Sequence, residues 1–332
     1  MFIVDAHLDL SYNALRGRDV LRPAREQSPD EEGIPTVGLP DLKAGGVGLV
    51  CATVFTMPSL DGKPGYHNAD EAYAEGQRHL EWYRRQIDAG VMRFVRNRAE
   101  IEAIRDDASS HSAILLLEGA DPLRTPADVA AWHATGLRAV GLAWRQTRHA
   151  GGTGAPGPLT SDGIALVKEL DRFGIIHDTS HLAEQSFWQL LDLTGGPIIA
   201  SHSNCRAIVP TDRQLSDEMI RAIAARGGVI GINFFDRFLL PPDQYGKRRA
   251  TLGDVATHVK HICDVTGSAQ HVALGTDMDG GLGRNEIPIE IETSGDLPKI
   301  ADALSDAGFN DLDVEGIAGA NWLAYFRKYL PT

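Results

Sequence analysis

Cysteine is scarce in this sequence of 332 residues. Its three cysteines, Cys51, Cys205 and Cys263, lie far apart and form no CxxC pair. A disulfide framework is therefore not expected, and a reducing compartment is the natural setting for such a chain. We expect the protein to be cytoplasmic.

Long hydrophobic runs are also missing. No apolar stretch approaches the ~20 residues that a helix needs to span a bilayer. The first residues, MFIVDAHLDL, reach an apparent strand at once and lack the basic and long apolar regions of a signal peptide. We therefore expect neither a membrane segment nor a secretory leader.

Basic residues are fewer than acidic ones. The chain has 32 Lys and Arg against 45 Asp and Glu, which gives a formal net charge of −13 at pH 7. A nucleic-acid partner requires a basic face on the protein, so this balance argues against one. The hydrophobic content of 43% and charged content of 23% are ordinary for a soluble globular protein.

Short apolar runs rich in β-branched residues recur along the chain. Runs without polar alternation are typical of strands buried on both faces, as in parallel sheets. The expected strands span residues 2–6, 48–54, 113–118, 138–143, 174–179, 197–201, 228–233 and 271–277. Apolar residues at helical spacing predict helices at 69–89, 162–173, 216–226 and 254–265, with a closing helical segment at 313–330.

The alternation of eight strands with helices predicts a (β/α)₈ TIM barrel. A doubly wound parallel sheet is the alternative. The stretches 55–68 and 145–163 contain turn-forming Gly and Pro, follow expected strands, and are predicted as loops of the active face. Because no domain boundary and no obvious internal repeat is visible, we expect a single domain over residues 1–332.

Metal-ligand residue types end five of the expected strands. In a barrel these ends meet at one face, where catalytic groups gather. One strand-end His is more often structural, and one Glu can simply cap a helix, but burying so many unpaired charges would be costly. Two cations would neutralise the cluster. The residues concerned are His7, Asp9, Glu118, His181, His202 and Asp277.

The other histidines lack such a setting. His149 lies in the 145–163 loop, where it is a candidate substrate contact. His177 lies inside an expected strand and is predicted to pack there. The remaining histidines are predicted as packing or surface residues, or fit no cluster: His67, His79, His111, His133, His258, His261 and His271.

Five motifs in order, DAHLD, LLLEGAD, DTSHL, SHSNCRAI and GTDMDG, resemble those of the membrane (renal) dipeptidase family of the amidohydrolase superfamily. The resemblance runs from Asp5 to the GANWL segment near Trp322. Other branches of the superfamily usually pair an HxH motif with a carboxylated lysine. The HxD motif with a glutamate found here is the dipeptidase arrangement.

The resemblance implies a site with two zinc ions per chain. The implied roles are His7 and Asp9 on one zinc, Glu118 bridging both, His181 and His202 on the second, and Asp277 transferring protons. It also implies a small dipeptide-like substrate and a homodimer.

The resemblance also implies substrate contacts. Arg213, in PTDRQLSD, matches the family's arginine that grips the substrate carboxylate, whereas Arg206 aligns less well. Trp144 stands where well-studied members have a histidine that contacts the substrate carbonyl. An indole N–H can donate one hydrogen bond but cannot become cationic. Trp144 therefore replaces that contact more weakly, or Arg145 or His149 supplies it.

The function that the resemblance implies is zinc-dependent hydrolysis of small dipeptides, or of related N-acyl amino acids, including those with a D-residue at the C-terminal position. Two alternatives remain open: another hydrolase of the superfamily, such as a lactonase or deaminase, and a metal-binding protein that has lost catalysis. Asp277, which metal binding alone does not require, favours a working enzyme.

Overall fold

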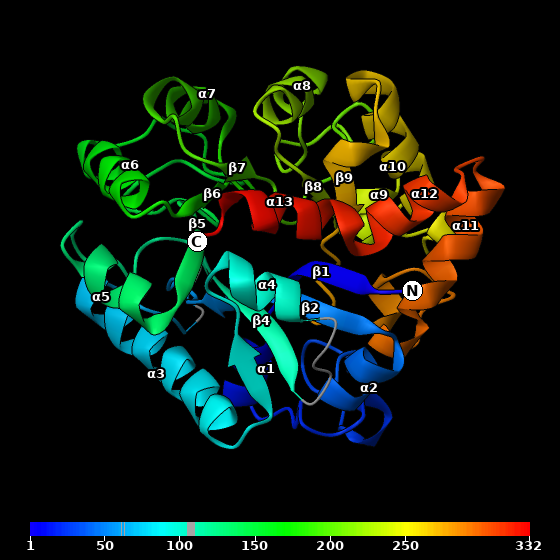
Figure 1. The fold of residues 1–332 in the computed structure, drawn as a ribbon, viewed down its shortest axis with the longest axis horizontal. Helices are drawn as coiled ribbons and strands as arrows, with labels where there is room; N and C mark the ends of the chain where they lie inside the picture. Colours follow the sequence, from blue (N-terminus) through cyan, green and yellow to red (C-terminus); the bar gives the residue numbers. More distant parts are fainter. Residues whose placement is uncertain (61, 63, 105–109) are drawn as a thin grey trace.

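The computed structural model describes residues 1–60, 62, 64–104 and 110–332. Within them, eight parallel strands form a nearly closed barrel in the order β7-β6-β5-β4-β2-β1-β9-β8 (Figure 1). A parallel bridge between Ala200 and Ile230 joins the two ends of this order. The barrel strands are β1 (Ile3–Leu8), β2 (Val47–Phe55), β4 (His111–Glu118), β5 (Leu137–Gly141), β6 (Ile176–Asp178), β7 (Ile198–Ile199), β8 (Ile230–Ile232) and β9 (Val272–Leu274).

The predicted TIM barrel is confirmed, and the doubly wound alternative is wrong because the sheet curls back on itself. Each of the eight expected strands has a counterpart in the barrel. One further strand, β3 (Met92–Phe94), escaped prediction because three residues carry too little pattern; it pairs with the first residues of β4.

Helices surround the barrel. They are α1 (Leu10–Leu15), α2 (Leu39–Ala44), α3 (Ala69–Asp88), α4 (Arg98–Ala103), α5 (Asp128–Thr135), α6 (Ser161–Arg172), α7 (Glu184–Leu193), α8 (Asp217–Ala225), α9 (Asp236–Leu239), α10 (Leu252–Thr266), α11 (Ile300–Asp306), α12 (Asp311–Glu315) and α13 (Asn321–Tyr329). Short 3₁₀ turns are η1 (Ala24–Glu26), η2 (Ala269–His271), η3 (Arg284–Glu286) and η4 (Ser294–Lys299), and η5 (Gly316–Ala320) is a π-helical turn. The four predicted helices correspond to α3, α6, α8 and α10, and the predicted closing segment to α12, η5 and α13.

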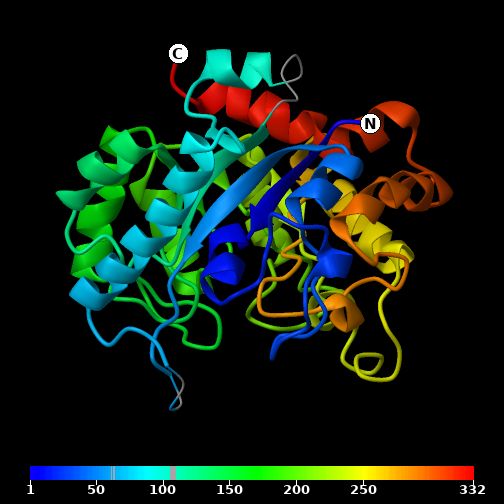
Figure 2. The same cartoon turned by 90° about the horizontal axis from the view of Figure 1, so that it is seen from below.

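Alternate strand residues fill the barrel interior. Val4 and Ala6 of β1 are fully buried in one apolar cluster with Trp322 and Phe326 of α13. The Trp322 indole also donates a hydrogen bond of 2.9 Å to the carbonyl of Leu274. Figure 2 shows α13 and α4 at one end of the barrel and the long connecting loops at the opposite end. Side chains therefore close the amino-terminal mouth, and a site can open only at the carboxyl ends of the strands.

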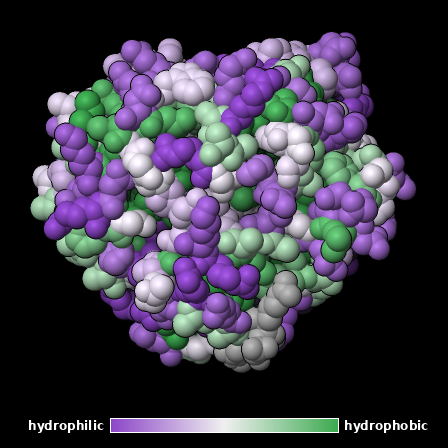
Figure 3. Space-filling model, turned by 45° about the horizontal axis from the view of Figure 1, so that its top comes forward, coloured by the Kyte–Doolittle hydropathy of each residue, from purple (hydrophilic) through white to green (hydrophobic). Residues whose placement is uncertain are grey.

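The surface is mixed in character. On the face shown in Figure 3, hydrophobic residues form patches between hydrophilic ones. Every helix in the described part of the chain falls short of the length and apolarity that crossing a bilayer would demand. Of the predicted loop 55–68, residues 61 and 63 lie outside the described residues.

Candidate metal centre

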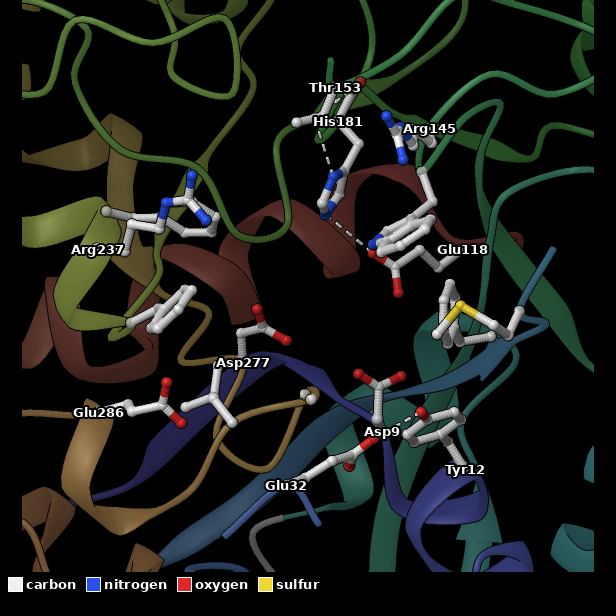
Figure 4. Close-up of a pocket in the computed structure, with 18 of the residues that line it drawn as sticks. Asp9, Tyr12, Glu32, Glu118, Arg145, Thr153, His181, Arg237, Asp277 and Glu286 are labelled. Carbon is white, nitrogen blue, oxygen red and sulfur yellow. Dashed lines mark hydrogen bonds and ion pairs between the residues drawn. The ribbon is translucent and has the colours of Figure 1, made fainter. Parts of the chain in front are cut away.

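The six strand-end residues meet at the carboxyl mouth of the barrel. His7 and Asp9 come from the end of β1, Glu118 is the last residue of β4, and His181 follows β6; His202 and Asp277 follow β7 and β9. Their ligand atoms form three overlapping groups of three residues, each within 4.8 Å. In Figure 4, the carboxylates of Asp9, Glu118 and Asp277 and the ring of His181 point into one cavity.

An irregular strand end positions the first pair. The register of β1 against β2 shifts between Asp5 and Leu8, the signature of a bulge that redirects side chains beside a site. Buried Asp5 holds this bend, because its carboxylate accepts hydrogen bonds from the His7 N–H and from the Thr276 N–H and hydroxyl. Asp5 thus ties the end of β1 to the segment that carries Asp277.

Glu118 lies at the centre of the cluster. Its Oε1 is 3.2 Å from His181 Nε2 and 3.4 Å from His202 Nε2. Its Oε2 is 3.4 Å from His7 Nε2, which lies 3.8 Å from the Asp9 carboxylate. One oxygen therefore faces each pair of ligand-type residues, as in a carboxylate that bridges two cations.

The imidazole nitrogens are suited to metal ligation. His7 Nε2 is buried and has no hydrogen-bond partner among the described residues. His181 Nε2 and His202 Nε2 approach one another to 2.9 Å beside Glu118. Nitrogen and carboxylate donors of this kind are those that zinc accepts, so the residues present fit a pair of divalent metal ions.

The Nδ1 atoms of His7, His181 and His202 face hydroxyl groups. Thr153 Oγ1 lies 3.1 Å from His181 Nδ1, and Ser201 Oγ lies 2.7 Å from His202 Nδ1 and 3.3 Å from His7 Nδ1. Ligating histidines usually donate their second ring N–H to such an acceptor, which leaves Nε2 for the metal.

The electrostatics of the cluster are interdependent. Burial raises the pKa of Glu118, but the neighbouring His7, His181 and His202 outweigh it and hold that pKa well below its usual range. Burial lowers the pKa of His181 to about 4, which keeps this ring neutral, as a ligand must be.

Asp277 is buried at the edge of the cluster. Its Oδ2 accepts a hydrogen bond of 2.8 Å from Asn233, and its Oδ1 lies 3.9 Å from His7 Nε2. Burial raises the pKa of Asp277 to about 8, and cations bound beside it would pull this value down.

Backbone strain marks the same region. His181, Asp277 and Asp279 have φ angles of 64°, 58° and 62°, in the left-handed region that non-glycine residues rarely adopt. Such conformations cost free energy and cluster at functional sites. These positive φ angles cannot be predicted from the sequence, because contacts with the surrounding structure determine them.

The cluster opens into a cavity of about 1030 Å³. Trp144 lies on its wall, with its ring centroid 5.2 Å from that of Phe55 and 6.3 Å from that of His181. Residues of both predicted loops, 55–68 and 145–163, line the same wall.

Beyond the cluster, the sequence analysis named only Arg145 among the charged residues of the cavity wall and missed the others. These residues lie in the connections that follow strand ends, which is the signal that could have found them. They are Arg16, Glu31, Glu32, Arg237 and Glu286. Glu32 is held in place by the Tyr12 hydroxyl, which donates to it over 2.8 Å.

His149 does not lie on the cavity wall. Its side chain is 1% exposed, because the loop folds back so that the His149 carbonyl accepts a hydrogen bond from Thr160 at the start of α6. The proposed substrate contact of His149 is therefore not supported by its position, and we do not retain it.

Arg213 lies directly behind the ligands. Its side chain donates to the His202 carbonyl over 2.5 Å and to Ser203 Oγ over 2.9 Å, and its Nε has no partner among the described residues. The ring of Phe238, which lines the cavity, lies 5.2 Å from the guanidinium carbon. Arg206 instead pairs with Glu184 away from this cavity.

Comparisons with known proteins find similarity over nearly the whole chain. Residues 1–329 match a family model described as membrane dipeptidase, peptidase family M19. An uncharacterized protein of Klebsiella pneumoniae, from the 5' region of pqqA, is 32% identical over 252 residues, covering 72% of this chain and 90% of that protein.

Two solved structures are similar throughout. A family M19 metallopeptidase named dipeptidase AC is 27% identical with a TM-score of 0.85, covering 100% of this chain and 99% of that one. A metallopeptidase of Rhodobacter sphaeroides, liganded with a phosphinate mimic of the dipeptide L-Ala-D-Ala, is 26% identical with a TM-score of 0.83 and covers 99% of each chain.

Proposed function

The chain belongs to the membrane dipeptidase family, peptidase family M19, and is a metallo-dipeptidase; from this premise we propose that it uses two zinc ions to hydrolyse small dipeptides, including L,D-dipeptides. The observation that carries the dinuclear site is Glu118, whose two oxygens face different pairs of ligand-type residues.

We assign His7 and Asp9 to one zinc, His181 and His202 to the other, and Glu118 to both. The distances around Glu118 and the hydroxyl groups at each Nδ1 support this assignment. When bound, the metal pair supplies Lewis-acid polarisation of the scissile carbonyl and a water whose pKa is lowered to about 7.

Asp277 is our candidate for proton transfer. It receives the proton of the attacking water and delivers it to the leaving amine. Its burial and its hydrogen bond from Asn233 support this role, because they fix Oδ2 and leave Oδ1 toward the cluster.

Arg213 is our candidate for the substrate carboxylate. Its buried Nε, which has no partner among the described residues, and its position beside His202 and the cavity-lining Phe238 ring support this role. Trp144 remains a proposed contact for the carbonyl side of the substrate.

A free dipeptide carries opposite charges at its two ends, and the cavity wall carries both signs as well. The acidic Glu32 and Glu286 and the basic Arg237 and Arg145 line it. Acceptance of a D-residue at the C-terminal position is supported by the L-Ala-D-Ala mimic bound to the Rhodobacter sphaeroides relative.

The test combines metal content with a substrate panel. Protein purified with ample zinc should contain about two zinc ions per chain and hydrolyse L,L- or L,D-dipeptides. At most one metal at full loading would contradict the dinuclear site. Hydrolysis of lactones or deamination without peptidase activity would favour the alternative hydrolases, and two metals with no activity on any of these substrates would favour lost catalysis.

We also propose that the protein works in a reducing compartment such as the cytoplasm, since Cys51, Cys205 and Cys263 are all free. The uninterrupted family match supports one domain over residues 1–332. A homodimer stays a prediction of the family resemblance.

A further inference from the structure

Ser201, between β7 and His202, is fully buried and has three close polar neighbours. Its Oγ lies 2.7 Å from His202 Nδ1, 3.3 Å from His7 Nδ1 and 2.5 Å from Asp178 Oδ2. One hydroxyl therefore contacts a proposed ligand of each metal, together with a buried carboxylate.

Counting hydrogens settles which atom donates. A hydroxyl has one proton and two lone pairs, whereas a carboxylate only accepts. Asp178 Oδ1 already accepts from the backbone N–H groups of Ser180 and Ser201, at 3.0 and 2.8 Å, so Oδ2 takes the Ser201 proton. Both Ser201 lone pairs are then left for His7 and His202.

A fourth neighbour lies farther away than the three already named. Ser180 Oγ is the most distant, at 3.4 Å from Ser201 Oγ. It already accepts hydrogen bonds from the His202 N–H at 3.0 Å and from the Ser203 hydroxyl at 3.2 Å.

We propose that Ser201 and Asp178 form one positioning pair that sets the tautomer of His7 and His202 together. Each ring donates its Nδ1–H to Ser201 and keeps the Nε2 lone pair for its metal. The inference rests on the proposed metal ligands. His181 is independent of this pair, because its Nδ1 faces Thr153.

Asp178→Asn is the most informative variant, because it reverses the hydrogen bond between Ser201 and residue 178 while keeping the shape of the side chain. The asparagine oxygen stays with the two backbone N–H groups, and its NH₂ faces Ser201. Ser201 must then accept from the amide and donate to one imidazole. That ring carries its proton on Nε2, which removes it as a ligand.

The chain offers a matched control in Asp171. This carboxylate accepts hydrogen bonds from the Thr194 hydroxyl at 2.6 Å and His177 Nε2 at 2.7 Å, so it also joins a hydroxyl and an imidazole. None of these three residues belongs to the ligand groups found in the described residues. Asp171→Asn therefore loses a comparable carboxylate without touching the ligands.

The experiment measures zinc affinity by chelator competition for the full chain and for S201A, D178N and D171N, after circular dichroism has confirmed folding. S201A should weaken both sites about 10–100-fold, the usual effect of removing a hydrogen-bond partner of a ligand. D178N should weaken binding at least as much and lose about one zinc equivalent. D171N should stay within about twofold of wild type.

Histidine ¹⁵N NMR of the zinc-loaded protein gives a second readout. In S201A the Nδ1 protons of His7 and His202 should exchange with solvent faster, while that of His181 stays as in wild type. Unchanged exchange at His7 and His202 would overturn the inference even if D178N failed to fold.

The two proposals fail differently. Wild-type protein that binds fewer than two zinc ions contradicts the proposed function itself. Wild-type protein that binds two, while folded S201A and D178N keep wild-type affinities, contradicts only the role of Ser201 and Asp178.

Discussion

At the scale of single residues, Glu118 is the member shared by both proposed metal positions. Glu118→Gln should therefore lower the occupancy of both zinc sites, because the amide is a weaker ligand and cannot bridge through two anionic oxygens. His181→Ala should mainly empty one site. Elemental analysis after dialysis checks both, and full occupancy in Glu118→Gln would exclude a bridging role.

Asp277 can be separated from the metals by its own substitution. Asp277→Asn should leave the zinc content nearly intact and reduce kcat by about 10²–10⁴, the range for losing a general acid–base group. Steady-state kinetics with metal analysis on the same sample measures this. Activity within a few-fold of wild type would mean that another group on the cavity wall carries the proton.

Arg213 can be tested through the charge of the substrate. Arg213→Met should lower kcat/KM for a free dipeptide by about 10–150-fold, since a charge-assisted contact contributes roughly 1.5–3 kcal/mol. The same dipeptide with an amidated C-terminus should be almost unaffected.

Arg206→Met serves as the control, because Arg206 pairs with Glu184 away from the cavity. Equal losses on both substrates would mean that Arg213 supports the structure, through its hydrogen bonds to His202 and Ser203. No loss on either substrate would mean that another residue binds the substrate carboxylate. The exposed Arg237 on the cavity wall is the first candidate.

At the scale of elements, the π-helical turn η5 lies against β1 with no room for a side chain at Gly319. A Cβ on Gly319 would come within 2.6 Å of the Phe2 carbonyl oxygen and 3.0 Å of the Val4 nitrogen, both backbone atoms that cannot yield easily. Gly319→Ala should therefore destabilise the fold by about 1–3 kcal/mol, the usual cost of overpacking.

Urea unfolding measures that loss against Gly195→Ala. A Cβ on Gly195 meets nothing within 4 Å, and its φ lies outside the left-handed region, so this variant should stay within about 0.5 kcal/mol of wild type. Equal stability of the two variants would show that η5 can move away from β1.

At the scale of the whole molecule, the metals should contribute to stability. Zinc at 100 times its dissociation constant adds about 2.7 kcal/mol per site. Chelation should therefore lower Tm by roughly 5–10 °C, and zinc should restore it. Scanning calorimetry measures the shift, and Glu118→Gln should largely abolish it. An unchanged Tm on metal removal would mean that the sites are empty or weak.

The sequence by itself determined the barrel and the ligand-type residues that end its strands. Strands buried on both faces must be continuously apolar, so their ends are visible as the first polar residues, as at Glu118 and at Thr276 just before Asp277. Because parallel strands of a barrel end at one face, six residues far apart in the sequence could be assigned to one cluster. The short strand β3 was lost because three residues show no period.

Tertiary structure alone decided the rest, because loops fold by contacts with distant segments. Burial of His149 behind its loop, the ring of Phe238 over Arg213, and the charged cavity wall depend on such contacts. The left-handed backbone at His181 and the hydrogen bonds that Ser201 shares between two histidines arise in the same way. A sequence pattern records which residues are buried along an element, but not which hydroxyl a ligand will meet.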